Sequence, residues 1–146
     1  MHLHPFVGPQ QWVSEFSKYD AGWLRIFKSE NEGEMRRVHW EDLNYPARIA
    51  TLASAGVPLI QYDNGEAIAA TQSLARRLDI GIFYKNPEHL GEQLHDKEKM
   101  ARLQNNLWSQ RDIFTFDSHA DALLDFFRQI IRAHPTRVSR LSPGLH

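Results

Sequence analysis

The sequence contains no cysteine, no large excess of charge of either sign and no long hydrophobic run. Without thiols, disulfide scaffolds, thiolate nucleophiles and thiolate zinc sites are excluded, and a reducing compartment is favoured. The net charge is −1 over 146 residues, so the basic excess typical of nucleic-acid-binding domains is missing. The longest apolar runs, such as 53–60, are far shorter than the ~20 residues of a membrane span. We therefore expect a cytoplasmic domain with no nucleic-acid partner and no transmembrane segment, and we leave a peripheral membrane role open.

Several catalytic and cofactor motifs are also missing. No Walker A, H-E-x-x-H, G-x-S-x-G or G-x-G-x-x-G pattern occurs in the chain. His2 and His4 are two residues apart and would share one face of a strand, but no further ligand lies close to them in the sequence. The first residues show no basic stretch followed by an apolar one, so no signal peptide is expected. We expect no bound metal and no cofactor.

The apolar residues predict short strands that alternate with helices. Strand-like runs cover 3–6, 21–27, 57–62 and 80–84. Helical spacing covers 10–19, 44–56, 66–78, 87–94, 97–114 and 118–132. Continuous apolar strands that alternate with helices form parallel sheets covered on both faces. We predict a partial Rossmann-like α/β domain over 1–133, with about four strands, helices on both faces and a helical C-terminal end; 134–146 would form a loosely ordered tail.

Polar residues after the second predicted strand are the first candidate site. Ligands of parallel sheets bind outside the carboxyl ends of the strands, next to helix N-termini. Lys28, Glu30 and Asn31 follow the strand of 21–27, where the lysine could meet an anion and Glu30 or Asn31 could accept bonds from hydroxyl groups. A solvated loop explains the same residues equally well. The tryptophans at 12, 23, 40 and 108 are expected to lie in the core rather than to bind a ligand.

Two predicted helix starts provide further candidates. Asn44 is a favoured capping residue, and Arg48 follows one turn later, where it could bind a phosphate bidentately. Asp63 and Asn64 precede the helix of 66–78, where a carboxylate and an amide can bind a sugar or ribose hydroxyl. The alternatives are a surface arginine on a capped helix and ordinary turn chemistry at 63–65.

Segment 43–48, Leu-Asn-Tyr-Pro-Ala-Arg, together with 52–60, resembles a motif of GT-B glycosyltransferases of the glycosyl transferases group 1 type. In that family a Pro-x-Lys/Arg helix with an alanine-rich end leads into a Gly-x-Pro step and a buried strand. Segments 19–22, 80–83, 88–94 and 114–117 follow the family's order as well. The resemblance covers nearly all of 1–132.

The resemblance implies the C-terminal, nucleotide-sugar-binding domain of such an enzyme. Its substrate would be a UDP- or GDP-sugar, with the diphosphate near the helix of Asn44 and with Arg48 as the basic residue. Glycosyl transfer would rely on electrostatic stabilisation of the leaving diphosphate, without a metal. The family's ribose-binding glutamate corresponds to Thr51 in this sequence. The resemblance assigns no catalytic residue here.

The chain has room for only one of the two domains that face each other in GT-B enzymes. We therefore expect either a missing N-terminal acceptor domain or a homo-oligomer through the exposed face. The chain alone would then be incomplete as an enzyme and could be inactive. The alternative is a non-catalytic α/β module, or a truncated paralogue, that binds a protein partner. An unrelated flavodoxin-like domain would need a phosphate loop after the first strand, and 6–9 is a poor one.

Overall fold

The computed structural model describes residues 6–25 and 27–133 of the chain. The chain divides into two compact units, of which the first ends at Phe114 and the second begins at Thr115. This division falls inside the domain of 1–133 that the sequence predicts. His2, His4, the tail of 134–146 and all but the last residue of the predicted strand of 3–6 lie outside the described residues. Phe6 itself is in no strand.

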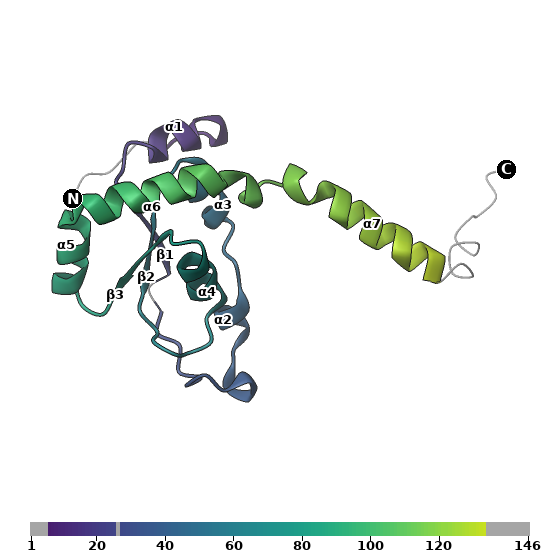
Figure 1. Cartoon of the computed structure of the whole chain (residues 1–146), viewed down its shortest axis with the longest axis horizontal. Helices are drawn as coiled ribbons and strands as arrows, with labels where there is room; N and C mark the ends of the chain where they lie inside the picture. Colours follow the sequence, from purple (N-terminus) through teal and green to yellow (C-terminus); the bar gives the residue numbers. More distant parts are fainter. Residues whose placement is uncertain (1–5, 26, 134–146) are drawn as a thin grey trace. The chain divides into compact units, whose positions relative to one another are not determined.

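A parallel sheet forms the centre of the first unit (Figure 1). Within the described residues it has three strands in the order β1-β2-β3: β1 (Gly22–Arg25), β2 (Leu59–Tyr62) and β3 (Gly81–Tyr84). Leu59 pairs with Gly22 on one side and with Gly81 on the other. The predicted α/β class and parallel sheet are confirmed, whereas the fourth strand is not found among the described residues.

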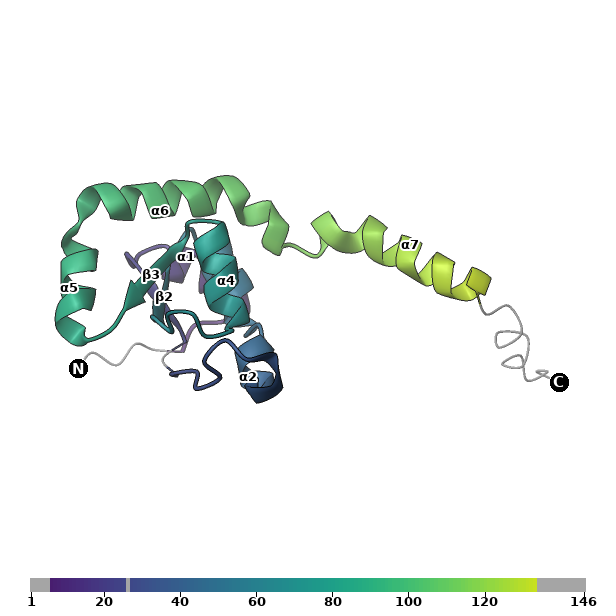
Figure 2. The ribbon, with the colours of Figure 1, turned by 60° about the horizontal axis from the view of Figure 1, so that its bottom comes forward.

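The predicted helices occur in the predicted order and most are shorter than predicted, whereas η2 and α2 lie in a polar segment for which no helix was predicted. Before β1 lie η1 (Pro9–Gln11) and α1 (Trp12–Phe16), and between β1 and β2 lie η2 (Met35–Arg37), α2 (Trp40–Leu43) and α3 (Arg48–Ser54). Next come α4 (Ala70–Arg77) between β2 and β3, then α5 (Pro87–His95), α6 (Lys97–Gln110) and η3 (Arg111–Phe114). Figure 2 shows α5 beside β3 and α6 continuing from it.

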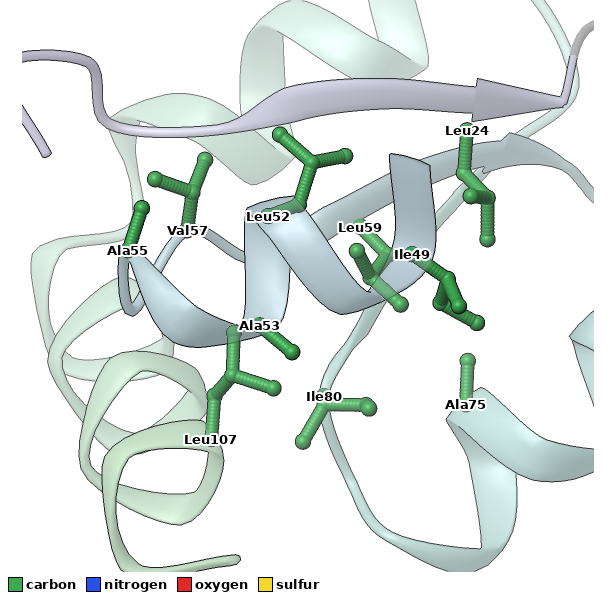
Figure 3. Close-up of a cluster of buried hydrophobic side chains, with 10 residues drawn as sticks. All are labelled: Leu24, Ile49, Leu52, Ala53, Ala55, Val57, Leu59, Ala75, Ile80 and Leu107. Atoms are coloured by element: carbon green, nitrogen blue, oxygen red, sulfur yellow. The ribbon is translucent and has the colours of Figure 1, made fainter. Parts of the chain in front are cut away.

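Apolar side chains pack on both faces of the sheet because successive residues of a strand point to opposite sides. Leu59 belongs to a cluster with Ile49 of α3 and Ala75 of α4 (Figure 3). The next residue, Ile60, belongs to a second cluster with Leu103 of α6. Helices therefore cover both faces, as the sequence predicts.

The tryptophans do not lie in the core, contrary to expectation. Their exposed fractions run from 41% to 71%. Small and aliphatic side chains fill the space between the short strands and their helices, which leaves the large rings at its margin. Trp23, for example, lies on the edge strand β1 and contacts Tyr84 edge-on, with 5.3 Å between ring centroids. Trp12, Trp23 and Trp40 line the two concave surfaces described below.

The described part of the second unit contains the helix α7 (Asp117–Ala133). Asp117 begins the helix, where its carboxylate is favourable for the helix dipole. The apolar residues of α7 recur at intervals of three and four, and they are exposed within this unit.

Candidate functional site

A pocket of about 180 Å³ opens at the carboxyl end of β1, which we call the β1 pocket. Parallel sheets bind ligands at this edge. The segments around it come from β1, from α2 and the chain that follows it, and from the starts of α3 and α4. Its polar and aromatic lining includes Arg25, Trp40, Glu41, Asn44, Arg48 and Thr71.

Arg25 brings a buried guanidinium to the β1 pocket from the end of β1. The residue is 8% exposed. Its Nη2 donates to Oδ1 of Asp42 at 2.8 Å and to Oγ of Ser29 at 3.3 Å. Its Nη1 is also buried and has no hydrogen-bond partner among the described residues. An unsatisfied buried donor costs about 1–3 kcal/mol, so an oxygen atom that reached Nη1 would remove this cost.

Asp42 supplies the negative charge that balances Arg25. Burial by itself would raise the pKa of this carboxyl group. Hydrogen bonds from the Ser29 hydroxyl, the His39 backbone N–H, Arg25 and the Asn31 amide outweigh burial and lower the pKa well below its usual range. The N–H of His39 and Nδ2 of Asn31 both lie 3.1 Å from Oδ2. Asp42 is therefore ionised at neutral pH and pairs with a buried cation.

The loops around the β1 pocket are tied to one another by buried amides. Oδ1 of Asn31 accepts from the N–H of Gly33 at 3.0 Å and from the N–H of Ile68 at 2.8 Å. Nδ2 of Asn31 donates to the Ile68 carbonyl at 2.8 Å. Oδ1 of Asn64 accepts from the N–H of Ser29 at 2.7 Å. The loop after β1 is thus joined to the loop after β2, which holds the pocket in a defined shape.

An irregularity in β1 explains the position of Arg48. The register with β2 shifts between Trp23 and Arg25, and Leu24 has no register partner in β2. The carbonyl of Leu24 accepts from Nε of Arg48 at 3.2 Å and from its Nη2 at 2.6 Å. Bulges of this kind re-aim strands next to functional sites. The Arg48 guanidinium is therefore fixed at the β1 pocket by a backbone carbonyl.

Thr71 adds a second unsatisfied polar atom to the β1 pocket. The residue lies in the first turn of α4 and is fully buried. Its Oγ1 has no hydrogen-bond partner among the described residues. Two buried polar atoms without partners, Nη1 of Arg25 and Oγ1 of Thr71, belong to side chains that line one pocket. Such groups are rare in folded proteins, so their presence in two side chains of one pocket makes this pocket the candidate site.

Asn44 and Arg48, the candidates from the helix predicted at 44–56, both line the β1 pocket. The prediction that Asn44 caps this helix is wrong, because α3 begins at Arg48 and its N-cap is Ala47, with no side-chain cap. Asn44 instead follows α2 with extended backbone. Pro46 disfavours helical backbone at Tyr45, which delays the start of α3.

Lys28 and Glu30 are exposed and do not line the β1 pocket. The residues that alternate with them, Ser29 and Asn31, turn inward and bind Asp42. Glu30 lines a separate surface depression of about 380 Å³. The sequence analysis identified the polar segment and named Asn31 as a possible acceptor, but Lys28 and Glu30, which it also named, face outward.

Asp63 and Asn64 do not stand at a helix start, because α4 begins only at Ala70. Oδ1 of Asp63 accepts from Nη2 of Arg76 at 2.7 Å and from the N–H of Gly65 at 3.0 Å. The backbone N–H of Asn64 donates to Oε1 of Gln72 at 2.8 Å. These contacts are turn chemistry, the alternative that the sequence left open.

Thr51 lies at a different surface. It lines an apolar groove of about 780 Å³ that α1, β1 and α3 border, together with Trp12, Phe16 and Trp23. We call this surface the apolar groove. Arg48 lines both the groove and the β1 pocket, whereas Thr51 lines only the groove.

Sequence reasoning did not select Arg25, Asp42 or Thr71. A signal for the first was present: an arginine inside the apolar run of 21–27 needs a buried counter-ion. Asp42 belongs to a polar stretch and carries no local signal that it is that counter-ion. Thr71 likewise has no local signal, because a threonine in a first helical turn is ordinary.

No group of three or more His, Asp or Glu side chains in 6–25 and 27–133 is arranged to hold a metal ion. Within the same residues, none of the helices is both long and apolar enough to cross a bilayer.

Comparisons with known protein families, with curated proteins and with solved structures find no match to this chain. The class of protein that the fold itself defines is an α/β domain with a parallel sheet. The likeness to GT-B glycosyltransferases rests on the sequence motifs alone.

Proposed function

We propose that this chain binds a nucleotide-diphospho-sugar in the β1 pocket, as the donor-binding part of a glycosyltransferase. The observation that carries the proposal is the buried, unsatisfied Nη1 of Arg25 in a pocket that Arg48 and Thr71 also line. Guanidinium groups match the oxygens of a phosphate in charge and geometry. The position at the carboxyl edge of a parallel sheet supports the same class of ligand.

The size of the pocket suggests which part of the ligand it holds. About 180 Å³ is less than the roughly 300–1,000 Å³ of pockets that enclose a whole drug-sized molecule. The diphosphate would therefore lie inside, and the base and sugar at the opening. Phe27 and Trp40 are exposed there and offer faces on which a base can stack. Glu41 offers a carboxylate to sugar or ribose hydroxyls.

In a complete enzyme, the two arginines would stabilise the negative charge that develops on the leaving diphosphate. Arg25 is already balanced by Asp42, so its unsatisfied donor contributes a directed hydrogen bond more than net charge. Arg48 forms no ion pair with the other described residues, so its full charge is available to the diphosphate. No residue of this chain is assigned to the bond-breaking step.

Calorimetric titration of the full chain with UDP, GDP, inorganic pyrophosphate and uridine tests the proposal. We expect the three diphosphates to bind and uridine, which lacks phosphate, to bind at least tenfold more weakly. Arg48→Lys should weaken diphosphate binding because it loses the bidentate fork. The matched control is Arg36→Lys, at the separate surface depression. Failure of all three diphosphates to bind would rule the proposal out.

Thr71→Val should separate ligand binding from stability. The substitution removes a buried hydroxyl without a partner, so the free energy of unfolding should stay the same or rise. Diphosphate affinity should fall at least about tenfold, because a hydrogen bond to a charged group is lost. Thr51→Val, in the apolar groove, is the control and should leave affinity unchanged. Unchanged affinity in Thr71→Val would remove this residue from the site.

The apolar groove favours a second candidate function, a non-catalytic module that binds a protein partner. Trp12, Trp23 and Phe16 line it and are all at least 36% exposed. Exposed aromatic patches of this kind mark protein interfaces. Under this function, diphosphates would cause no thermal shift, and Trp23→Ser would abolish association with the partner. Under the first function, Trp23→Ser leaves diphosphate affinity unchanged.

A further inference from the structure

Asp42 accepts four hydrogen bonds from the described residues, and they divide equally between its two carboxylate oxygens. Oδ1 accepts from Nη2 of Arg25 at 2.8 Å and from Oγ of Ser29 at 2.5 Å. Oδ2 accepts from Nδ2 of Asn31 and from the N–H of His39, both at 3.1 Å. An ionised carboxylate has about four lone-pair sites. The acceptor capacity of Asp42 is therefore used up.

This saturation explains why the ion pair between Arg25 and Asp42 is one-sided. Guanidinium and carboxylate groups commonly pair as a fork, with two parallel N–H···O bonds. Here Nη2 of Arg25 contacts the carboxylate, whereas Nη1 is buried and has no hydrogen-bond partner in the described part of the chain. Because both sites of Oδ2 are taken by Asn31 and His39, the second bond of a fork has no acceptor. Asp42 thus balances the charge of Arg25 without using all of its donors.

The Ser29 hydroxyl occupies an acceptor site of Asp42 that Arg25 would otherwise fill. Ser29 is buried, donates to Oδ1 of Asp42 and also accepts from Nη2 of Arg25 at 3.3 Å. The hydroxyl, the carboxylate and the guanidinium therefore form a closed triangle. The backbone N–H of Ser29 donates to Oδ1 of Asn64 at 2.7 Å. This bond fixes Ser29 from the neighbouring loop, so the triangle has a defined geometry.

We propose that Ser29 is a positioning residue that keeps Nη1 of Arg25 free for a phosphate oxygen of the ligand. This inference rests on the proposed function of the β1 pocket. Without the hydroxyl, Oδ1 of Asp42 has an open acceptor site next to the guanidinium. Arg25 then turns Nη1 toward this site, because a buried donor without a partner is unfavourable. The pocket keeps its charge but loses a directed hydrogen bond to the ligand.

Calorimetric titration of the full chain with inorganic pyrophosphate at pH 7 tests the role of Ser29. Ser29→Ala should raise the dissociation constant at least about tenfold, because a hydrogen bond to a charged group is lost. Ser29→Thr keeps the hydroxyl and should retain most of the affinity. The control is Ser109→Ala, which removes a hydroxyl bonded to the backbone carbonyl of Asn106 at the surface of α6 and should have no effect.

A double-mutant cycle with Arg25→Lys separates positioning from a general loss of structure. The lysine ammonium can pair with Asp42 but has no second nitrogen to offer to a ligand, so Arg25→Lys should itself weaken pyrophosphate binding. Adding Ser29→Ala to Arg25→Lys should change the dissociation constant less than about twofold, because no Nη1 is left to position. Urea unfolding of each variant establishes that the first unit is folded.

The outcomes distinguish the role of Ser29 from the proposed function. If the original chain does not bind pyrophosphate, the β1 pocket is not a phosphate site and both proposals fail. If the original chain and Ser29→Ala bind pyrophosphate equally well, the role of Ser29 alone is overturned. Equal weakening by Ser29→Ala with and without Arg25→Lys would also overturn it, because the hydroxyl would then act on the fold and not through Arg25.

Discussion

Replacement of Asp42 by asparagine is expected to lower the free energy of unfolding of the first unit by about 3 kcal/mol or more. The carboxylate is buried and accepts from Arg25, which is itself 8% exposed. Removing one member of a buried ion pair leaves the other charge without compensation, which costs about 3–5 kcal/mol. Urea unfolding followed by circular dichroism at pH 7 measures the loss.

The matched control is Asp79→Asn, which removes a carboxylate paired with Arg102 at the surface. Both of these side chains are at least half exposed. Exposed pairs contribute about 0–1 kcal/mol, so the control should lose far less stability than Asp42→Asn. Equal losses in the two variants would contradict the assignment of Asp42 as the buried counter-ion.

The same carboxylate should make the stability of the protein depend on acid. The pKa of Asp42 is lowered in the folded state, so its contribution is fully present above the unfolded value of about 4. As the pH falls below about 4, toward the lower pKa of the folded state, the carboxyl group of Asp42 binds a proton in the unfolded state but not in the folded state. The difference in stability between the original chain and Asp42→Asn should therefore be largest above pH 5 and shrink steadily toward pH 2. A difference that does not change between pH 6 and pH 3 would contradict this interpretation.

Leu107→Ala is expected to lower the free energy of unfolding by about 2–5 kcal/mol. Leu107 belongs to α6, has no exposed surface and completes the cluster with Ala53 of α3 and Ile80 (Figure 3). Truncation removes burial and leaves a cavity, because the surrounding helices and strand can move only partly to fill it. In a unit of this size the melting temperature should fall by roughly 10 °C or more.

The control for this substitution is Leu94→Ala on α5. Leu94 is 36% exposed and lies outside both buried clusters. Its truncation should cost about 1 kcal/mol or less, since its side chain loses little packing. If Leu94→Ala were as damaging as Leu107→Ala, the central cluster would not be the main source of stability.

The proposed ligand site and the stability of the unit depend on the same groups. Asp42 and Asn31 hold the loops that shape the β1 pocket, and Arg25 links them to the end of β1. Changes at these residues would alter both folding and binding. Thr71 is different, because its hydroxyl makes no hydrogen bond with the described residues. This is why Thr71→Val is the more discriminating test of the ligand site.

The sequence by itself determined the elements whose signals are local. Apolar runs predicted the three strands, and helical spacing predicted the helices of the second half, because both patterns depend on neighbours within a few residues. The start of α5 is such a case: Asn86 accepts from the N–H of His89 at 2.8 Å and Pro87 takes the first helical position. Asn44 and Pro46 carry a similar signal, but Asn44 follows the last residue of α2, and the N-cap of α3 is Ala47.

Only the tertiary structure decided which polar side chains lie inside. Ser29 and Asn31, rather than Lys28 and Glu30, turn inward because their partners come from distant segments: Asp42, Asn64 and the backbone of Ile68. The counter-ion of Arg25 is 17 residues away, and no local pattern distinguishes Asp42 from the other acidic residues of the same polar segment. A buried polar group is stable only where long-range packing supplies its hydrogen bonds. Asn44 and Arg48, which the sequence selected, line the β1 pocket, whereas its buried polar residues Arg25 and Thr71 were not selected from local patterns.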